Sequence, residues 1–307
     1  MTANPIWITL DGFEPGAAAE RFLRDAAPYG VILFARHLKS PEQTRELCLC
    51  VREALGGSAR LALDQEGGRV SRLAALGFSF PGASELQGDC EKAGASAREM
   101  GGVLRSLGFD VDFAPVADLG PAAPGTGLEG RLYGDDPETV SACCAAFLGG
   151  LAESGVEGCL KHFPGLGGSA VDSHSALPEI PGGGTAREAH LEPYRRRAGR
   201  APYVMTAHGL YESLGGALPS SLEPGTYALL SGLGFGGLSV TDDLGMGAVS
   251  GRASLPELAA SALQAGASLA LWVSNQEETL RALDALEKAP AFLATRALLV
   301  DSMRKEA

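Results

Sequence analysis

The chain has 307 residues, of which 45% are hydrophobic and 20% are charged, enough to bury a sizeable core. Its net charge of −12 and isoelectric point of about 4.9 argue against a surface that binds nucleic acid or anionic membranes without specificity. The first ten residues do not resemble a signal peptide and no apolar run could span a bilayer, so we expect a cytoplasmic protein.

Short apolar segments alternate along the chain with stretches rich in Ala, Leu, Glu and Arg, a pattern that predicts alternating strands and helices. In chain order, we expect strands at residues 6–10, 30–34, 60–64, 111–116, 156–162, 203–208, 237–242 and 267–273. The expected helices lie near residues 41–55, 84–107, 136–154, 191–198, 223–231, 255–265 and 277–288. Most strands are continuous apolar runs, as in parallel strands covered on both faces. Roughly eight strand–helix units without a linker predict an α/β fold, a single TIM-like (β/α)8 barrel domain over residues 1–307.

Polar side chains collect where five of these strands end. In a barrel the carboxyl ends of parallel strands meet on one face, so we expect these side chains to share a site. Asp64 and Asp242 are also well placed to cap a following helix, and His208 is equally compatible with a structural role. The polar residues at these ends are Asp64, Gln65, Glu66, Arg69, Arg72, Asp112, Asp118, Lys161, His162, His208, Asp242 and Asp243.

The segment KHFPGLGGSAVDSH (161–174) concentrates groups that can act on a ligand. It closes with Asp172 and His174, where a carboxylate can orient an imidazole and raise its pKa. A local loop hydrogen bond without chemistry is the alternative. This segment begins one of two Gly- and Pro-rich loops, 121–130 and 164–185, and such loops inside a compact domain are usually functional or disordered. The glycines at 182–184 suit a flexible return from the second loop.

Neighbouring residues on an extended chain point to opposite faces, so Asp242 and Asp243 should not share a role. His37 and His190 have no supporting pattern and are expected at the surface. The chain contains neither a dinucleotide-binding GxGxxG fingerprint nor a Walker A motif. None of the cysteines forms a CxxC pair, so we expect reduced, buried thiols in a cytosolic protein at Cys48, Cys50, Cys90, Cys143, Cys144 and Cys159.

Seven segments together resemble glycoside hydrolase family 3, and specifically its single-domain bacterial β-N-acetylglucosaminidases. They occur in family order, cover most of residues 30–250, and include two highly specific motifs, DQEGGR and KHFPG…DSH. The family fold is a TIM-like barrel, in agreement with the strand–helix count. The matching segments are GVILFARH (30–37), LDQEGGRVSRL (63–73), DFAPVADL (112–119), GRLYGDDP (130–137), KHFPGLGGSAVDSH (161–174), VMTAHGLY (204–211) and GGLSVTDDLGMGAV (236–249).

The resemblance implies roles for eight residues. The nucleophile follows the Ser or Thr of the strand-end motif, here Asp242 after Thr241, and the acid/base is His174 paired with Asp172. One position departs from the family: KHFPGHG is usual, and Leu166 stands here in place of the second histidine. The dyad is kept, so we expect activity, while the packing of the loop and its specificity stay open. The implied sugar contacts are Asp64, Arg72, Arg131, Lys161 and His162.

The resemblance therefore implies a retaining hydrolase that removes terminal β-linked N-acetylglucosamine without a metal or organic cofactor. The expected partner is a carbohydrate, a GlcNAc-containing muropeptide taken into the cytoplasm or an oligosaccharide, and neither nucleic acid nor membrane. The oligomeric state is open, with a monomer expected. The alternatives are a β-glucosidase-type member of the family, an inactive sugar-binding homologue, a Schiff-base aldolase on Lys161, and a metal-dependent hydrolase using His162, Asp172, His174 and Asp242.

Overall fold

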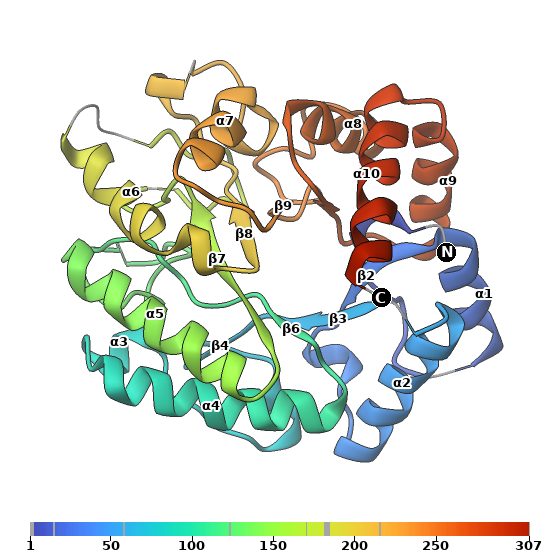
Figure 1. Ribbon diagram of the computed structural model, residues 1–307, viewed down its shortest axis with the longest axis horizontal. Coiled ribbons are helices and arrows are strands. Elements are labelled where there is room, and N and C mark those ends of the chain that lie inside the picture. The colour runs from blue at the N-terminus through green and yellow to red at the C-terminus, as the bar shows by residue number, and fades with distance from the viewer. Residues whose placement is uncertain are drawn as a thin grey trace.

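A sheet of parallel strands lies at the centre of the molecule, with helices around it (Figure 1). The computed structural model describes residues 3–14, 16–57, 59–122, 124–169, 171–180, 185–214 and 216–306. The glycine run at 182–184 lies outside this part of the chain. None of the helices described is long and apolar enough to cross a bilayer.

Within the described residues, eight parallel strands follow the order β10-β1-β2-β3-β6-β7-β8-β9. They are β1 (Asn4–Ile8), β2 (Pro28–Ile32), β3 (Arg60–Leu63), β6 (Val111–Asp112), β7 (Glu157–Phe163), β8 (Tyr203–Thr206), β9 (Leu238–Thr241) and β10 (Ala270–Leu271). The outer strands β9 and β10 meet at a parallel bridge between Val240 and Leu269. There Leu269 N donates to Ser239 O at 2.9 Å and Thr241 N donates to Leu269 O at 3.1 Å. The sheet therefore curls until its edges meet, which confirms the predicted TIM-like barrel.

Helices follow most strands and cover the outside of the barrel. They are α1 (Ala17–Ala26), α2 (Pro41–Ala54), α3 (Ala83–Leu86), α4 (Cys90–Leu107), α5 (Pro137–Glu153), α6 (Thr185–Arg197), α7 (Pro224–Gly232), α8 (Leu255–Ala265), α9 (Gln276–Leu286) and α10 (Pro290–Glu306). Local sequence explains where two of them begin. Ser40 accepts a hydrogen bond from Gln43 N at the start of α2, and Asp136 accepts one from Thr139 N at the start of α5. In each case a proline occupies the first turn, where its missing N–H costs nothing.

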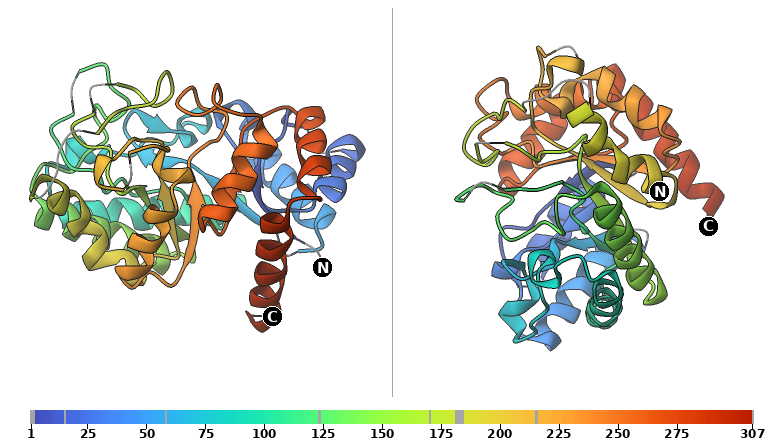
Figure 2. Two further views of the ribbon diagram at one scale, coloured as in Figure 1. Left: turned by 90° about the horizontal axis from the view of Figure 1, so that it is seen from above. Right: turned by 90° about the vertical axis from the view of Figure 1, so that its left-hand side faces the viewer.

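The barrel interior is a separate apolar cluster, built around Trp7, Phe113 and Tyr203. At the carboxyl ends of the strands, Met205 of this cluster lines a cavity. Near the amino ends, Leu299 of α10 packs into the same cluster, so the last helix covers the bottom of the barrel. Figure 2 shows α10 extending beyond the barrel on that side.

The predicted strands and helices are all found, with differences in detail. The strand expected at 267–273 is only Ala270–Leu271 plus a bridge at Leu269. The strand expected at 111–116 is only Val111–Asp112 plus a bridge at Val116, because Pro115 has no N–H to donate to a neighbouring strand. The helix expected at 84–107 is split into α3 and α4, since Asp89 caps a new helix. The helices α1 and α10 and the hairpin of β4 (Gln65–Gly67) and β5 (Val70–Ser71) were not predicted from the sequence.

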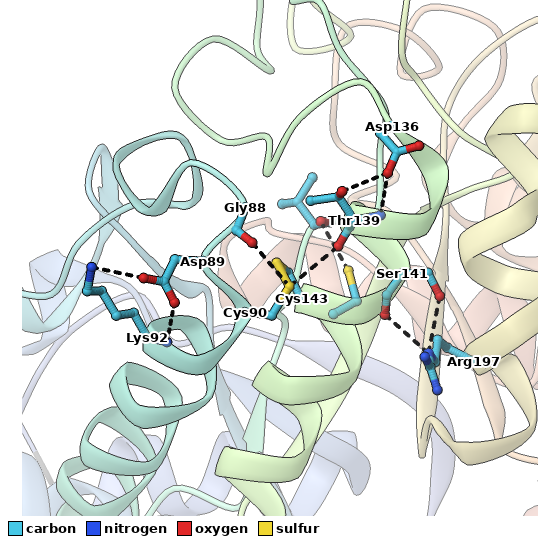
Figure 3. Close-up of a disulfide and its surroundings, with 11 residues drawn as sticks. Gly88, Asp89, Cys90, Lys92, Asp136, Thr139, Ser141, Cys143 and Arg197 are labelled. Atoms are coloured by element: carbon cyan, nitrogen blue, oxygen red, sulfur yellow. Dashed lines mark hydrogen bonds and ion pairs between the residues drawn. A yellow bond between two sulfur atoms is a disulfide. The ribbon is translucent and has the colours of Figure 1, made fainter.

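Cys90 and Cys143 form a disulfide, so the prediction of reduced thiols is wrong for this pair. The bond joins the amino-terminal part of α4 to α5, two helices that lie side by side (Figures 1 and 3). The sequence could not predict this pairing, because 53 positions separate the two residues and only the packing of α4 on α5 brings them together. Cys48, Cys50, Cys144 and Cys159 are free and buried, as predicted.

Reducing this disulfide is expected to lower the free energy of unfolding by about 2–4 kcal/mol, because the bond closes a long loop and restricts the unfolded chain. Urea unfolding of the oxidised protein with and without reductant measures the loss. The variant Cys90→Ser/Cys143→Ser should unfold at the same low urea concentration in both conditions. The expectation would be contradicted if the urea midpoint of the wild type were the same with and without reductant while a thiol titration showed that two cysteines are oxidised.

Candidate active site

The carboxyl ends of the strands surround a cavity of about 300 Å³. This volume lies at the small end of the range for small-molecule sites. The cavity brings together the eight residues to which the family resemblance gave roles. They are Asp64, Arg72, Arg131, Lys161, His162, Asp172, His174 and Asp242. Of the twelve polar strand-end residues predicted to share a site, seven line the cavity, namely Asp64, Glu66, Arg69, Arg72, Lys161, His162 and Asp242. The prediction is wrong for the other five, which do not line it: Gln65, Asp112, Asp118, His208 and Asp243.

A network of ion pairs forms one wall of the cavity. Lys161 Nζ lies 2.9 Å from Asp64 Oδ1 and 2.6 Å from Glu66 Oε1, and Arg72 lies 3.5 Å from Asp64. Arg131 donates two hydrogen bonds of 2.7 Å to the two carboxylate oxygens of Glu66. Such two-point contacts hold a guanidinium in one orientation. The wall therefore presents charged groups whose positions are set before any ligand arrives.

Lys161 is held as a charged ammonium. Burial lowers the pKa of Lys161, but the carboxylates of Asp64 and Glu66 outweigh burial and raise that pKa above its usual value. Burial likewise raises the pKa of Glu66, and the opposing charges of Arg131 and Lys161 bring it well below its usual range. A Schiff-base lysine must lose its proton to attack a carbonyl. The environment of Lys161 therefore disfavours the aldolase alternative.

Glu66 lines the cavity, as predicted for the polar strand ends, but the family resemblance gave it no role in the site. Its signal was the DQE spacing, because residues two apart on an extended chain share a face and Glu66 follows Asp64 by two positions. Arg69, also in the cavity wall, is exposed and donates to the carbonyl oxygens of Thr126 and Glu129. These two side chains complete the charged lining next to the predicted contacts.

Lys161 and His162 are adjacent on β7, and both line the cavity. The pairing of β7 with β8 is irregular between Leu160 and Phe163, which allows neighbouring side chains to share a face. The His162 side chain is only 6% exposed, and its Nδ1 lies 2.6 Å from Oδ2 of the fully buried Asp118. Asp118 itself is beneath the cavity and not in its wall.

The predicted dyad is formed. His174 Nδ1 lies 2.7 Å from Asp172 Oδ1, and the same oxygen accepts the backbone N–H of His174 at 2.9 Å. Burial raises the pKa of Asp172, but the hydrogen bonds and charge of His174 lower it overall, so the carboxylate stays ionised beside the ring. The His174 side chain is 66% exposed, in contrast to buried His162. The dyad histidine therefore lies at the mouth of the cavity, in reach of water.

The loop that carries the dyad lies against the segment after β9. Gly247 N donates to His174 O and Ala248 N donates to Ser173 O, each at 3.2 Å. A Cβ atom at Gly247 would lie 2.8 Å from the carbonyl oxygens of His174 and Ser175. Only glycine permits this approach, so the dyad loop is joined by its backbone to the chain that follows Asp242.

Asp242 and Asp243 point to different surroundings, as predicted. Asp242 follows β9 in the cavity wall, and its Oδ1 accepts Asp243 N at 2.9 Å. Burial raises the pKa of Asp242, but the neighbouring imidazoles of His162 and His208, the backbone N–H of Asp243 and the charge of Lys161 bring it below its usual value, so Asp242 is ionised. Asp243 turns away, and its Oδ1 accepts the N–H groups of Gly245 at 2.8 Å and Val273 at 2.9 Å.

Replacing Asp243 by asparagine is expected to stabilise the fold above pH 6. Burial raises the pKa of Asp243 from 3.8 to about 6. Because the folded state holds this proton more tightly than the unfolded chain, the carboxyl costs stability as pH rises from about 4 to 6. An amide oxygen keeps both backbone contacts without titrating, so the variant should gain up to roughly 3 kcal/mol.

Urea unfolding of wild type and Asp243→Asn at pH 4, 5, 6 and 7 tests this expectation, with Asp25→Asn on the exposed face of α1 as control. The difference between Asp243→Asn and wild type should be small at pH 4 and reach its full size by pH 7. A difference that stays constant across this range would contradict the argument.

Leu166, the departure from the family motif, is only 5% exposed and lines the cavity. It packs in an apolar cluster with Val116, Leu128, Leu132 and Ala207. Its backbone N donates to Asp118 at 2.6 Å. The leucine is therefore accommodated by its apolar neighbours, and the turn that leads to the dyad keeps a polar anchor through its backbone.

Three histidines lie outside the cavity wall. His208 is buried, with Nδ1 2.7 Å from Ser221 Oγ and Nε2 2.9 Å from Asp243 O, which is a structural role. The prediction that His37 and His190 lie at the surface is wrong. His37 is fully buried and contacts Leu10 O at 2.9 Å, while His190 is half-buried against Gly165. The burial of these two histidines depends on contacts with distant segments, so the spacing of residues in the sequence could not predict it.

The metal-site alternative is not supported by the arrangement of these donors. Among the residues that the structure describes, no three His, Cys, Asp or Glu side chains gather closely enough to hold a metal ion. His162 and His174 each contact a separate aspartate, Asp118 and Asp172. Of the four residues named for that alternative, Asp172 and His174 therefore form one pair, His162 is paired with Asp118 outside the set, and Asp242 stands apart from both pairs.

Comparisons with known proteins agree with this geometry. Residues 9–302 match the model of the glycosyl hydrolase family 3 N-terminal domain. A β-hexosaminidase of Alkalilimnicola ehrlichii is 35% identical over 291 residues, covering 90% of this chain and 82% of that protein. The β-hexosaminidase LpqI of Mycobacterium tuberculosis is 40% identical over 247 residues, covering 76% of this chain and 63% of LpqI.

The structure of a family 3 β-N-acetylglucosaminidase from Paenibacillus superposes with a TM-score of 0.85 at 30% identity, covering 99% of this chain and 62% of that one. The chain thus spans somewhat less than two thirds of the Paenibacillus enzyme and of LpqI. The match nevertheless runs through every strand from β2 to β10 and through all the residues of the cavity wall. The chain belongs to glycosyl hydrolase family 3.

Proposed function

We propose that the chain is a retaining glycoside hydrolase that removes terminal β-linked N-acetylglucosamine. The observation that carries the proposal is that one cavity holds Asp242, the Asp172–His174 dyad and the charged wall of Asp64 and Lys161. These groups supply a nucleophile, an acid/base and polar contacts for sugar hydroxyls. The relatives named β-hexosaminidase and β-N-acetylglucosaminidase support this substrate class.

In the first step, Asp242 attacks the anomeric carbon while His174 gives a proton to the departing oxygen. The C–O bond to the leaving group breaks and a glycosyl-enzyme ester forms on Asp242. In the second step, His174 takes a proton from water, which attacks the same carbon and releases the carboxylate. Two inversions leave the product with the starting β configuration.

The surroundings of Asp242 and His174 match the catalytic roles proposed for them. Asp242 is ionised and therefore ready to attack. His174 is exposed, so it can contact both the leaving group and the incoming water. The ionised carboxylate of Asp172 holds Nδ1 of His174 and orients the ring. Asp64, Lys161 and the arginines provide charge-assisted hydrogen bonds to the sugar. The chemistry requires no metal or organic cofactor.

The natural substrate in this proposal is a muropeptide of the cell wall. Muramic acid carries a carboxylate, and Arg69, exposed at the cavity wall, has a guanidinium that donates to the carbonyl oxygens of Thr126 and Glu129. Guanidinium–carboxylate pairs are among the stronger polar contacts in proteins. Arg69 therefore offers a partner for an acidic leaving group.

Hydrolysis of p-nitrophenyl β-N-acetylglucosaminide, p-nitrophenyl β-glucoside and the disaccharide GlcNAc-β-1,4-MurNAc tests the proposal. We expect both GlcNAc substrates to be cleaved, the glucoside to be cleaved poorly, and NMR to detect β-GlcNAc as the first product. An α anomer formed first would exclude the retaining mechanism. A preference for the glucoside would favour the β-glucosidase alternative, and saccharide binding without any turnover the inactive homologue.

The remaining features of the proposal are a single catalytic domain over residues 1–307, a monomer, and no interaction with nucleic acid or membrane. A cytoplasmic location stays a prediction, and one observation weighs against it. Structural disulfides persist mainly in oxidising compartments, and Cys90 and Cys143 form one. Trapping free thiols in freshly lysed cells, followed by counting them in the purified protein, tests it: a cytoplasmic protein should show six thiols, and an oxidised one two fewer.

A further inference from the structure

Asp118 is a buried carboxylate that lies directly beneath the cavity, after the end of β6. Its side chain is fully buried. Oδ2 lies 2.6 Å from His162 Nδ1 and 3.3 Å from the backbone N of His162, and Oδ1 accepts the backbone N–H of Leu166 at 2.6 Å. Both oxygens therefore serve as acceptors, one for a residue of the cavity wall and one for the turn that begins the dyad loop.

The other side of the His162 ring determines which nitrogen carries the proton. Arg131 Nη2 lies 3.4 Å from His162 Nε2. A guanidinium has donors and no acceptor, so Nε2 must offer a lone pair to Arg131. The ring hydrogen is then on Nδ1 and is donated to the carboxylate of Asp118. Because Glu66 fixes Arg131 by two hydrogen bonds, the ring is held from both sides.

The two aspartate–histidine pairs of the site differ in exposure. The side chains of Asp172 and His174 are 29% and 66% exposed, whereas those of Asp118 and His162 are 0% and 6% exposed. An exposed imidazole can exchange protons with water during a reaction. A buried imidazole between a carboxylate and a guanidinium keeps one tautomer and one orientation. The same pair of residue types is therefore built once for proton transfer and once for fixed hydrogen bonding.

We propose that Asp118 is a positioning residue that locks His162 in the Nδ1–H tautomer, with the Nε2 lone pair available as an acceptor toward the cavity. When a sugar binds, one of its hydroxyls replaces the long 3.4 Å contact of Arg131 and donates its O–H to the single Nε2 lone pair, so His162 accepts a hydrogen bond from the sugar and does not donate one. Through Leu166, the same carboxylate sets where the dyad loop leaves β7. The hydrogen bond from a sugar hydroxyl rests on the proposed function. The tautomer of His162 does not depend on that function.

The chemistry of Asp118 explains why an amide should not replace it. Asparagine has one acceptor and one donor on its side-chain head, whereas His162 Nδ1–H and Leu166 N–H both need an acceptor. If the amide nitrogen faces His162, the ring must change to the Nε2–H tautomer and lose its acceptor toward the sugar. If it faces Leu166, the turn before the dyad loop loses its anchor. Either orientation disturbs the site without changing the size of the side chain.

The kinetic test compares Asp118→Asn with Asp110→Asn on p-nitrophenyl β-N-acetylglucosaminide. Asp110 lies at the opposite end of β6, where it is paired with Arg52 and Arg105 far from the cavity. The variant Asp110→Asn therefore measures the general effect of losing a buried carboxylate, without a change in the site. For Asp118→Asn we expect kcat/KM to fall about 10- to 100-fold with a clear rise in KM. Asp110→Asn should keep the wild-type KM. An unchanged KM in Asp118→Asn, with kcat lowered only by loss of folded protein, would overturn the positioning role.

A spectroscopic test does not depend on turnover. In wild type labelled with 15N-histidine, the signals that disappear in His162→Gln identify His162, and we expect a protonated Nδ1 and an unprotonated Nε2 at neutral pH. A wild-type ring protonated on Nε2 would overturn the proposal even if the enzyme is active. Conversely, an inactive wild type with the expected tautomer would refute the proposed function and leave the role of Asp118 in orienting His162 intact.

Discussion

Replacing Asp242 by alanine is expected to lower kcat by roughly 10⁴- to 10⁶-fold, the size of loss found when a covalent nucleophile is removed. Without this carboxylate no glycosyl-enzyme can form, and the other carboxylates of the wall in the described part of the chain are already engaged, Asp172 by His174. Asp64 and Glu66 are engaged by Lys161, Arg72 or Arg131. Steady-state hydrolysis of p-nitrophenyl β-N-acetylglucosaminide measures the loss.

Azide distinguishes the loss of a nucleophile from general damage. In Asp242→Ala, azide can occupy the space of the missing carboxylate, attack the face opposite the leaving group and give an α-glycosyl azide. The matched control is Asp243→Asn, one residue further on, whose side chain binds backbone N–H groups outside the cavity. This control should retain most of the activity. Comparable losses in both variants, or no azide product from Asp242→Ala, would remove Asp242 from the nucleophile's role.

Replacing His174 by alanine is expected to slow hydrolysis of a saccharide leaving group by about 10²- to 10⁴-fold, the usual contribution of general acid–base catalysis. A sugar alkoxide leaves poorly without a proton, whereas 2,4-dinitrophenolate leaves well without one. The deficit should therefore be much smaller for a dinitrophenyl substrate, where a glycosyl-enzyme can still form on Asp242. Measuring kcat for both leaving groups in both proteins gives the difference.

The stereochemistry of azide rescue again identifies the step. In His174→Ala the glycosyl-enzyme accumulates and azide attacks it from the face that the leaving group has vacated, so the product is the β-glycosyl azide. Asp172→Asn should show the same leaving-group trend at smaller size, because it keeps the imidazole but loses the carboxylate that orients it. Equal losses for good and poor leaving groups would show that His174 does not supply the proton.

The fold and most of the site could be predicted from the sequence because both depend on local patterns. Continuous apolar runs marked the parallel strands, and the polar residues that follow them, such as Asp64 and Asp242, necessarily meet at one end of a barrel. Asp172 and His174 are two residues apart, so their contact required no tertiary information. The short strand β6 was overestimated because an apolar run cannot show that Pro115 interrupts the hydrogen bonding.

Contacts between distant segments could not be predicted in this way. The disulfide joins residues 53 positions apart, the pair of Asp118 with His162 is separated by 44 positions, and that of Glu66 with Arg131 by 65. Each depends on the closure of the barrel and on the packing of helices or loops against it. The same holds for buried His37, whose partner Leu10 O lies 27 positions away.

The sequence by itself therefore determined the barrel, the family resemblance and the residues that gather at the carboxyl ends of the strands, because periodicity and short motifs are local properties of the chain. Only the tertiary structure decided how these residues are held: which carboxylate binds Arg131, which histidine is buried with a fixed tautomer, and which is left exposed at the mouth. Charge state and orientation depend on burial and on partners from other strands, and neither is encoded at a fixed spacing.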